Sequence, residues 1–213
     1  MRDNVHLILG TAHQSSWSMR AFLCASPLIE DVTIDWRTFD QNDRLSDPAG
    51  CPTAKVPVLC INNRSISIVE SLAIAEILAE LGGLQWPKDW IARAKARSLC
   101  LEFQSNSEAL RKAVPMDLSV DAQRLAPHHD LIAWVERLEK LIQRSDGEFL
   151  YGQLSIADAW FSPVIARAIR CDMHLSPVLQ AYFESLKATH GWKAWMGYVD
   201  RPNADYLSQR CNQ

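Results

Sequence analysis

The change of periodicity at Gly82-Gly83 constrains the fold more than any other feature of this sequence. Before it, strand patterns alternate with helical ones, in the order β-α-β, a polar loop, then β-β-α. After it, every regular pattern is helical. A chain of 213 residues can form one large domain or two small ones. We predict an α/β domain over residues 1–83, a linker over 84–90 and an all-helical domain over 91–213.

Two strand patterns flank the first helical pattern. Residues 5–9 are apolar, residues 21–25 are helical in pattern, and residues 31–37 alternate apolar and polar side chains. This order is typical of a βαβ unit, so the two strands are predicted to be parallel. Residues 62–64, Asn-Asn-Arg, form a turn signal that predicts an antiparallel hairpin further along the chain.

Pro57 opens the third strand pattern, at residues 55–61. Proline has no N–H to donate to a sheet, so it must lie at a strand start, an edge or a special turn. Only about 5–6% of X–Pro bonds in folded proteins are cis. The residues by themselves therefore favour a trans bond between Val56 and Pro57.

A pair of hydroxyl residues, Ser15 and Ser16, lies where the first strand pattern ends and the first helical pattern begins. Serine commonly caps a helix N-terminus. The unpaired N–H groups and partial positive charge of that terminus also favour a nearby anion. Taken alone, the two serines are best explained as a helix cap, with Ser18 one turn further inside.

The helical part has clear start signals. Asp89 can cap one long helix predicted over 91–113, and a second helix is predicted from Pro127. Ser155 and Asp158 have the spacing of a capping box before an apolar helix over 159–169, which we expect to be buried. Further helices are expected at 177–188 and 191–199. The tryptophans are assigned to packing: Trp134 and Trp160 in the core, Trp86 and Trp90 at the linker.

Composition excludes several classes of protein. The net charge is −3, so the basic excess of a nucleic-acid binder is missing. The six cysteines include no CxxC pair, and a disulfide framework is not expected. No apolar run is long enough for a membrane span, and residues 1–4 lack the pattern of a signal peptide, so we expect a cytoplasmic protein. His128 and His129 are adjacent and should diverge on a helix, so no metal site is predicted.

Four short motifs occur in order along the chain: SSWSMR at 15–20, KVPVL at 55–59, ES followed by LAI at 70–74, and SIADA at 155–159. Together they resemble motifs of the cytosolic glutathione S-transferase family, in a bacterial branch near the zeta class. The resemblance implies a thioredoxin-like N-terminal domain with a small mixed sheet, an all-helical C-terminal domain and a cis-proline in the KVPVL segment. It also implies a homodimer that uses glutathione as co-substrate in detoxification.

The resemblance also implies roles for individual residues. Ser15 would donate its hydroxyl to the glutathione sulfur, with Ser16 as the close alternative and the expected cap. The remaining glutathione contacts would be Ser16, Trp17, Lys55, Val56, Pro57, Glu70 and Ser71. The second-substrate pocket would include Gln14, Arg111 and Met116.

Three functions stay open at this point. The first is conjugation of the glutathione thiolate to a small electrophile. The second is a zeta-like, glutathione-dependent cis–trans isomerase of the maleylacetoacetate type. The third is a non-catalytic binding module, because Gln14 stands where related sequences often carry an aromatic residue. Trp17 occupies the place of a catalytic cysteine, which argues against thiol-based reductase chemistry.

Overall fold

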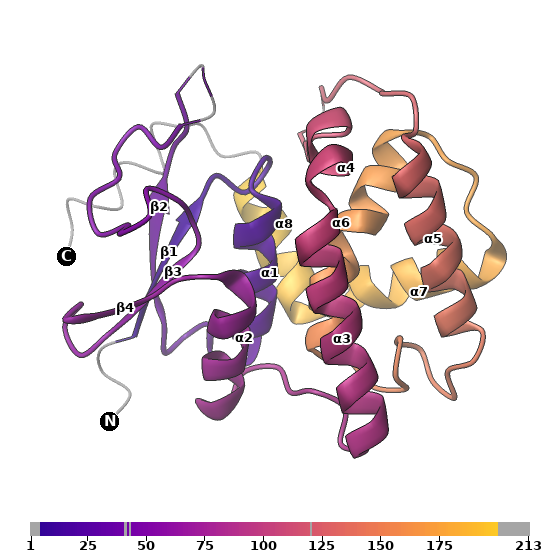
Figure 1. Ribbon diagram of the computed structural model, residues 1–213, viewed down its shortest axis with the longest axis horizontal. Coiled ribbons are helices and arrows are strands. Elements are labelled where there is room, and N and C mark those ends of the chain that lie inside the picture. Colours follow the sequence, from indigo (N-terminus) through magenta and orange to yellow (C-terminus); the bar gives the residue numbers. More distant parts are fainter. Residues whose placement is uncertain (1–4, 41, 43, 120, 200–213) are drawn as a thin grey trace.

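The computed structural model describes residues 5–40, 42, 44–119 and 121–199. Residues 1–4 and Cys211, which entered the sequence predictions, lie outside this part, as does the end of the predicted helical domain. Figure 1 shows a small sheet on the left and a group of helices on the right. Within the described residues, the sheet has four strands in the order β2-β1-β3-β4. The strands are β1 (His6–Gly10), β2 (Thr33–Arg37), β3 (Val58–Ile61) and β4 (Ile66–Ile68).

The pairing of the strands confirms the predicted mixed sheet. β1 pairs with β2 in parallel and with β3 in antiparallel fashion, and β3 and β4 form the predicted hairpin. Successive side chains of β1 point to opposite faces. Leu7 and Leu9 join the main hydrophobic core, whereas Ile8 packs with Val58 and Cys60 in a smaller cluster on the other face.

Eight α-helices and one short 3-10 helix are present in the described residues. They are α1 (Ser16–Ala25), η1 (Ser26–Leu28), α2 (Ser71–Glu80), α3 (Trp90–Asn106), α4 (Glu108–Ala113), α5 (His129–Ile142), α6 (Ile156–Arg170), α7 (Pro177–Ala188) and α8 (His190–Val199). The predicted helices at 177–188 and 191–199 are thus confirmed.

The centre of the helical part is α6. All but its last two residues are buried, as the apolar pattern predicts. Ser155 and Asp158 form the predicted capping box at its start. The ring of Trp160 is fully buried, and its indole N–H donates to the carbonyl of Cys100 at 3.0 Å.

Helix α1 joins the two parts of the molecule, because it packs against α2 and also against α6 and α8. Arg20, on α1, is fully buried and donates to the carbonyl of Trp160 at 2.8 Å and to that of Ser16 at 3.0 Å. One hydrophobic core runs from the sheet into the helices. The boundary at residue 83 therefore stays a prediction.

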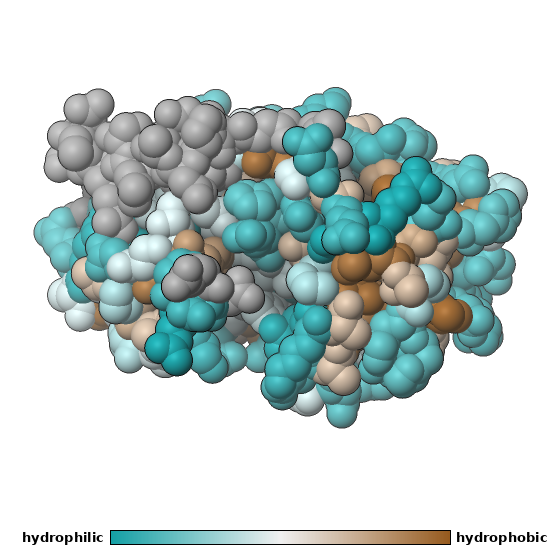
Figure 2. All heavy atoms as spheres, turned by 90° about the horizontal axis from the view of Figure 1, so that it is seen from above, coloured by the Kyte–Doolittle hydropathy of each residue, from teal (hydrophilic) through white to brown (hydrophobic). Residues whose placement is uncertain are grey.

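The surface is mostly polar in the view from above, with hydrophobic side chains gathered over the helical part (Figure 2). Among the described residues, none of the helices combines the length and the apolar character that crossing a bilayer requires.

Three details of the sequence prediction were wrong. The helix expected over 91–113 is two helices, α3 and α4, because the backbone leaves helical geometry at Ser107 (φ −97°, ψ 10°). The helix expected from Pro127 begins two residues later, after His128 in extended backbone geometry. Trp90 does not pack at the linker: it is 68% exposed, whereas Trp86 is buried.

Candidate active site

A cavity of about 500 Å³ lies between the start of α1, the loop before β3 and the residues around the ends of α4 and α6. This volume suits a small organic ligand. The backbone N–H of Leu118, beyond α4, donates to the carbonyl of His13, before α1, at 3.1 Å. This bond joins two walls of the cavity, one from each part of the molecule.

The cavity brings together most of the predicted site residues. Those that line it are Gln14, Ser15, Ser16, Trp17, Lys55, Val56, Arg111 and Met116. Pro57, Glu70 and Ser71 do not line it. The predicted thiol-end contacts and the predicted second-substrate residues therefore share one space, and the predicted γ-glutamyl contacts lie outside its walls.

Ser15, not Ser16, caps α1. The Oγ atom of Ser15 accepts from the backbone N–H of Ser18 at 3.4 Å and lies 2.7 Å from the Ser18 hydroxyl oxygen. Ser18 Oγ in turn accepts from the N–H of Gly10 at 2.9 Å, so Ser18 is structural, as predicted. The assignment of the cap to Ser16 was wrong, because Ser16 is already the first residue of the helix.

The Ser15 hydroxyl can donate a hydrogen bond to an anion in the cavity. Each hydroxyl has one hydrogen and can turn to suit its neighbours. The Ser15 hydroxyl donates to Ser18 Oγ, and rotation about its Cβ–Oγ bond can turn this hydrogen into the cavity instead. The N-terminus of α1 adds its partial positive charge at the same place. The arrangement can therefore stabilise a negatively charged atom beside Ser15.

Ser16 has a different partner. Its Oγ atom accepts from Nη2 of Arg167, on α6, at 3.2 Å, and both residues are buried while lining the cavity. A hydroxyl whose oxygen accepts from a guanidinium keeps its own hydrogen for another acceptor. Two adjacent hydroxyls can thus donate into the cavity: that of Ser15 lies beside the N-terminus of α1, and that of Ser16 is hydrogen-bonded to Arg167.

The bond between Val56 and Pro57 is cis. The trans bond favoured by the residues alone was wrong, and the cis bond implied by the family resemblance is confirmed. Val56 is half-buried in the cavity wall, Pro57 is buried behind it, and Lys55 is exposed at the edge.

Glu70 and Ser71 lie at the start of α2. Glu70 has a positive φ of 69° and makes no side-chain cap, so the simple capping explanation for this pair does not hold. Its carboxylate instead accepts from the amide of Gln104, on α3, at 3.0 Å. Ser71 is buried at the first position of the helix. The N-terminus of α2 therefore keeps its N–H groups without a side-chain cap from Glu70.

Positive charge dominates the cavity wall. Four basic side chains line it, and Asp117 is the only acidic residue among the described residues of the lining. The basic residues are Lys55, Arg111, Arg167 and Arg170. Burial lowers the pKa values of Arg111 and Arg167, the latter to about 9. The whole chain carries a net charge of −3, so the excess of cations in the cavity wall is opposite in sign to the overall charge.

Trp17 organises part of this charge. Its ring lies 4.4 Å from the guanidinium carbon of Arg20 and 5.0 Å from that of Arg111. It also meets the Trp160 ring edge-on, with the centroids 5.8 Å apart. A ring face offers partial compensation to a cation. Trp17 therefore holds Arg111 in the wall as well as lining the cavity itself.

Sequence reasoning missed five residues of the wall, namely Phe39, Leu45, Ala54, Arg167 and Arg170, whereas Pro115 and Asp117 belong to the segment 110–118 that the resemblance places in the second-substrate pocket. Pro115 and Asp117 flank the predicted Met116. The sequence did hint at Arg167 and Arg170, because they lie in an apolar helix. Burying an arginine costs free energy unless its charge has a partner. The loop residues carried no comparable signal.

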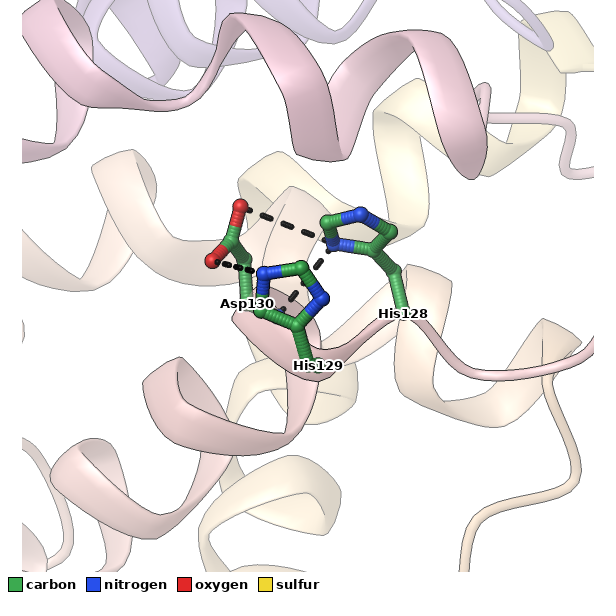
Figure 3. Close-up of side chains that lie close together, drawn as sticks. All are labelled: His128, His129 and Asp130. Atoms are coloured by element: carbon green, nitrogen blue, oxygen red, sulfur yellow. Dashed lines mark hydrogen bonds and ion pairs between the residues drawn. The ribbon is translucent and has the colours of Figure 1, made fainter.

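A second cluster lies at the start of α5 and consists of His128, His129 and Asp130 (Figure 3). The prediction that the two histidines diverge was wrong: their ring centroids are 4.1 Å apart, because His128 precedes the helix. Nδ1 of His128 accepts from the N–H of Asp130 at 3.2 Å. That nitrogen caps the helix, and the positive end of the helix disfavours a cation. We therefore assign the cluster to helix capping.

The fold matches solved structures over nearly the whole chain, although no family model and no curated protein matches the sequence. A glutathione transferase homologue from Burkholderia, solved with bound glutathione, is 24% identical, with a TM-score of 0.63 over 91% of this chain and 97% of that one. A maleylacetoacetate isomerase from Anaeromyxobacter dehalogenans, also with glutathione, is 23% identical, with a TM-score of 0.65 over 94% and 98%.

An Omega-class glutathione transferase from Trametes versicolor is similar in shape at lower identity. It is 18% identical, with a TM-score of 0.68 over 97% of this chain and 98% of that one. At such identities the likeness establishes the fold, and the activity has to be argued from the site. The chain has the glutathione transferase fold.

Proposed function

We propose that this protein is a glutathione transferase that joins the glutathione thiolate to a small electrophile. One observation carries the proposal: the Ser15 hydroxyl at the N-terminus of α1 and Val56, before a cis-proline, line the same cavity. Glutathione is a peptide with an ionisable thiol. A backbone edge to align the peptide and a hydroxyl to meet the sulfur are the two features that its activation requires.

The proposed binding mode uses the elements around the cavity. Val56 presents its backbone N–H and C=O to the cysteinyl part of glutathione, and Lys55 is placed to meet the glycine carboxylate. The γ-glutamyl carboxylate lies at the N-terminus of α2, beside Ser71, where helix N–H groups favour an anion. Glu70 accepts from the γ-glutamyl ammonium. The bond from Gln104 holds the Glu70 carboxylate in place.

The proposed chemistry begins with ionisation of the thiol. The thiol proton passes to solvent, and the sulfur anion accepts a hydrogen bond from Ser15 beside the positive end of α1. A carbon–sulfur bond then forms at the electrophilic carbon. The electron pair leaves with a departing group or rests on an activated carbon that takes a proton from water. No metal takes part in this scheme.

An isomerase is the second candidate, and the basic wall of the cavity favours it. The planar guanidinium of arginine pairs well with a carboxylate, and Arg111 and Arg170 both line the cavity. A solved relative in fold, the Anaeromyxobacter maleylacetoacetate isomerase, was crystallised with dicarboxyethyl glutathione and citrate in its active site. In an isomerase, the thiolate adds to a double bond, the adduct rotates, and the same thiolate leaves.

We also infer that the protein is a cytoplasmic homodimer that serves detoxification. The part of the chain that the structure describes exposes large apolar residues on β4 and α3, namely Ile66, Trp90, Ile91 and Leu101. α2 and α3 are the elements where we expect the dimer contact. Sedimentation velocity of the purified protein tests the homodimer, since a monomer at micromolar concentration contradicts it.

The decisive experiment is a glutathione titration by calorimetry, followed by assays with two electrophiles. A chlorinated aromatic compound tests conjugation, and maleylacetoacetate tests isomerisation. We expect saturable glutathione binding and turnover of at least one of the two. Binding without turnover of any electrophile across a wider panel supports a non-catalytic binding module. No glutathione binding refutes the proposal.

A further inference from the structure

Arg167 is a buried cation whose hydrogen-bond partners among the described residues are all neutral. Only 2% of its surface is exposed. Its Nε atom donates to the carbonyl of Val114 at 2.8 Å, Nη1 to the carbonyl of Pro163 at 3.1 Å, and Nη2 to Ser16 Oγ at 3.2 Å. Within the described ranges of the chain, no carboxylate contacts this guanidinium. Buried charges normally have a charged partner, so Arg167 is suited to an anion supplied by a ligand.

The charged groups around Arg167 make an anionic ligand still more favourable at this position. Arg20 on α1, Arg111 on α4 and Arg170 on α6 all face it, and the thiol of Cys171 is the remaining titratable neighbour. Asp117, in the cavity wall, lies 3.9 Å from Arg170. Burial first, and then the nearby cations, lower the pKa of Arg167 to about 9, so it stays charged at neutral pH. The net field at this wall favours negative charge.

Through its hydrogen bond to Ser16 Oγ, the positive charge of Arg167 acts on one hydroxyl in the cavity wall. Because Ser16 Oγ accepts from Arg167, the hydroxyl hydrogen of Ser16 is left to donate elsewhere. Ser16 lines the cavity next to Ser15. A hydrogen bond from a hydroxyl that is itself polarised by a cation is stronger than one from an unsupported hydroxyl.

We propose that Arg167 is a positioning residue for the glutathione thiolate: it orients the Ser16 hydroxyl toward the sulfur and supplies an uncompensated positive charge behind it. Ser15 and Ser16 then donate to the sulfur together, one supported by the N-terminus of α1 and the other by α6. Arg167 forms no bond to glutathione and keeps its protons, and the thiol proton goes to solvent. The proposal rests on the proposed function, since it needs glutathione in the cavity.

The test measures the thiol pKa of bound glutathione by ultraviolet absorbance of the thiolate across a pH series. We expect the wild type to lower this value from about 8.5, the ordinary value of a thiol. Arg167→Gln, which removes the charge, should raise it by about one unit relative to wild type. Arg167→Lys, which keeps the charge, should restore most of that shift. These opposite results separate charge from packing.

Arg37→Gln is the matched control. Arg37, on β2, is also buried, but it pairs with Asp35 and does not line the cavity. Removing it should leave the thiol pKa unchanged even where it lowers stability. Glutathione affinity at low pH, where the thiol is protonated, should be similar for wild type and Arg167→Gln.

The outcomes are distinct. If wild type binds no glutathione, the proposed function fails. If wild type lowers the thiol pKa and Arg167→Gln lowers it equally, the role of Arg167 is overturned while the proposed function stands. If Arg167→Gln does not fold, as judged by circular dichroism, Ser16→Ala takes its place. An unchanged thiol pKa in Ser16→Ala, or an Arg167→Lys variant that differs from wild type by a full unit, also overturns the inference.

Discussion

Removal of the Asp158 carboxylate should destabilise the fold strongly, because four donors converge on it. The backbone N–H of Leu150 donates at 2.9 Å, the N–H and hydroxyl of Ser155 both at 2.8 Å, and the hydroxyl of Tyr182 at 3.2 Å. The carboxylate has no solvent exposure. It ties together the start of α6, the segment before it and α7. Since α6 carries Arg167 and Arg170, this anchor also holds one wall of the cavity.

The magnitude follows from these contacts. A hydrogen bond to a charged group contributes about 1.5–3 kcal/mol, but contributions within one network do not add. Removing one partner of a buried charged network costs about 3–5 kcal/mol. We therefore expect Asp158→Ala to lower the free energy of unfolding by about 4 kcal/mol. For a chain of this size, that corresponds to a fall in Tm of about 8–16 °C.

Urea unfolding followed by circular dichroism at neutral pH measures this change. Ser155→Ala is the control, because it removes one donor of the capping box and leaves the carboxylate in place. Its cost should be about 1 kcal/mol. A loss below about 1 kcal/mol in Asp158→Ala would refute the assignment of the carboxylate as the anchor of α6.

Three further predictions concern charge and reactivity. Burial raises the pKa of Asp158 from 3.8 to about 6, so ionising it costs stability as pH rises through that range. The stability of wild type relative to Asp158→Asn should therefore fall by about 3 kcal/mol between pH 3 and 7, and a pH-independent difference in urea unfolding would contradict this. Arg111→Gln should raise KM for a carboxylate-bearing electrophile about tenfold more than KM for a neutral one, and equal changes in steady-state assays would exclude a carboxylate contact. Burial raises the pKa of Cys24 to about 12 and that of Cys100 well above its ordinary value, so peptide mapping after native iodoacetamide treatment should find neither labelled.

The features that the sequence predicted correctly have local causes. The hairpin after Val58 follows from a turn signal between two short strands, and the α6 start follows from Ser155 and Asp158 three residues apart. The residues at which helices end or begin within the helical part were harder to predict. Nothing within the helical pattern of 91–113 marks Ser107 as a stop, since serine is tolerated inside helices. Helix α5 begins two residues after Pro127 because His128 caps it.

The site residues likewise fall into two groups: those that local patterns reveal and those that only tertiary packing brings together. Ser15 and Val56 lie at junctions of elements that local patterns reveal, and a family resemblance gave them roles. Arg167 and Arg170 join the wall only because α6 packs across α1, a contact between segments about 150 residues apart. A single sequence carries no direct signal of such a contact. The cis bond at Pro57 likewise depends on its tertiary surroundings, because local statistics favour trans.

The central claim is that glutathione binds in this cavity and that the Ser15 hydroxyl stabilises its thiolate. The most direct test compares wild type and Ser15→Ala in glutathione binding by calorimetry and in turnover of an accepted electrophile at saturating glutathione. We predict a Kd within about threefold of wild type and a kcat lower by about 100-fold, since the hydroxyl acts mainly on the ionised sulfur. Equal kcat values for the two proteins, with glutathione bound by both, would contradict the claim.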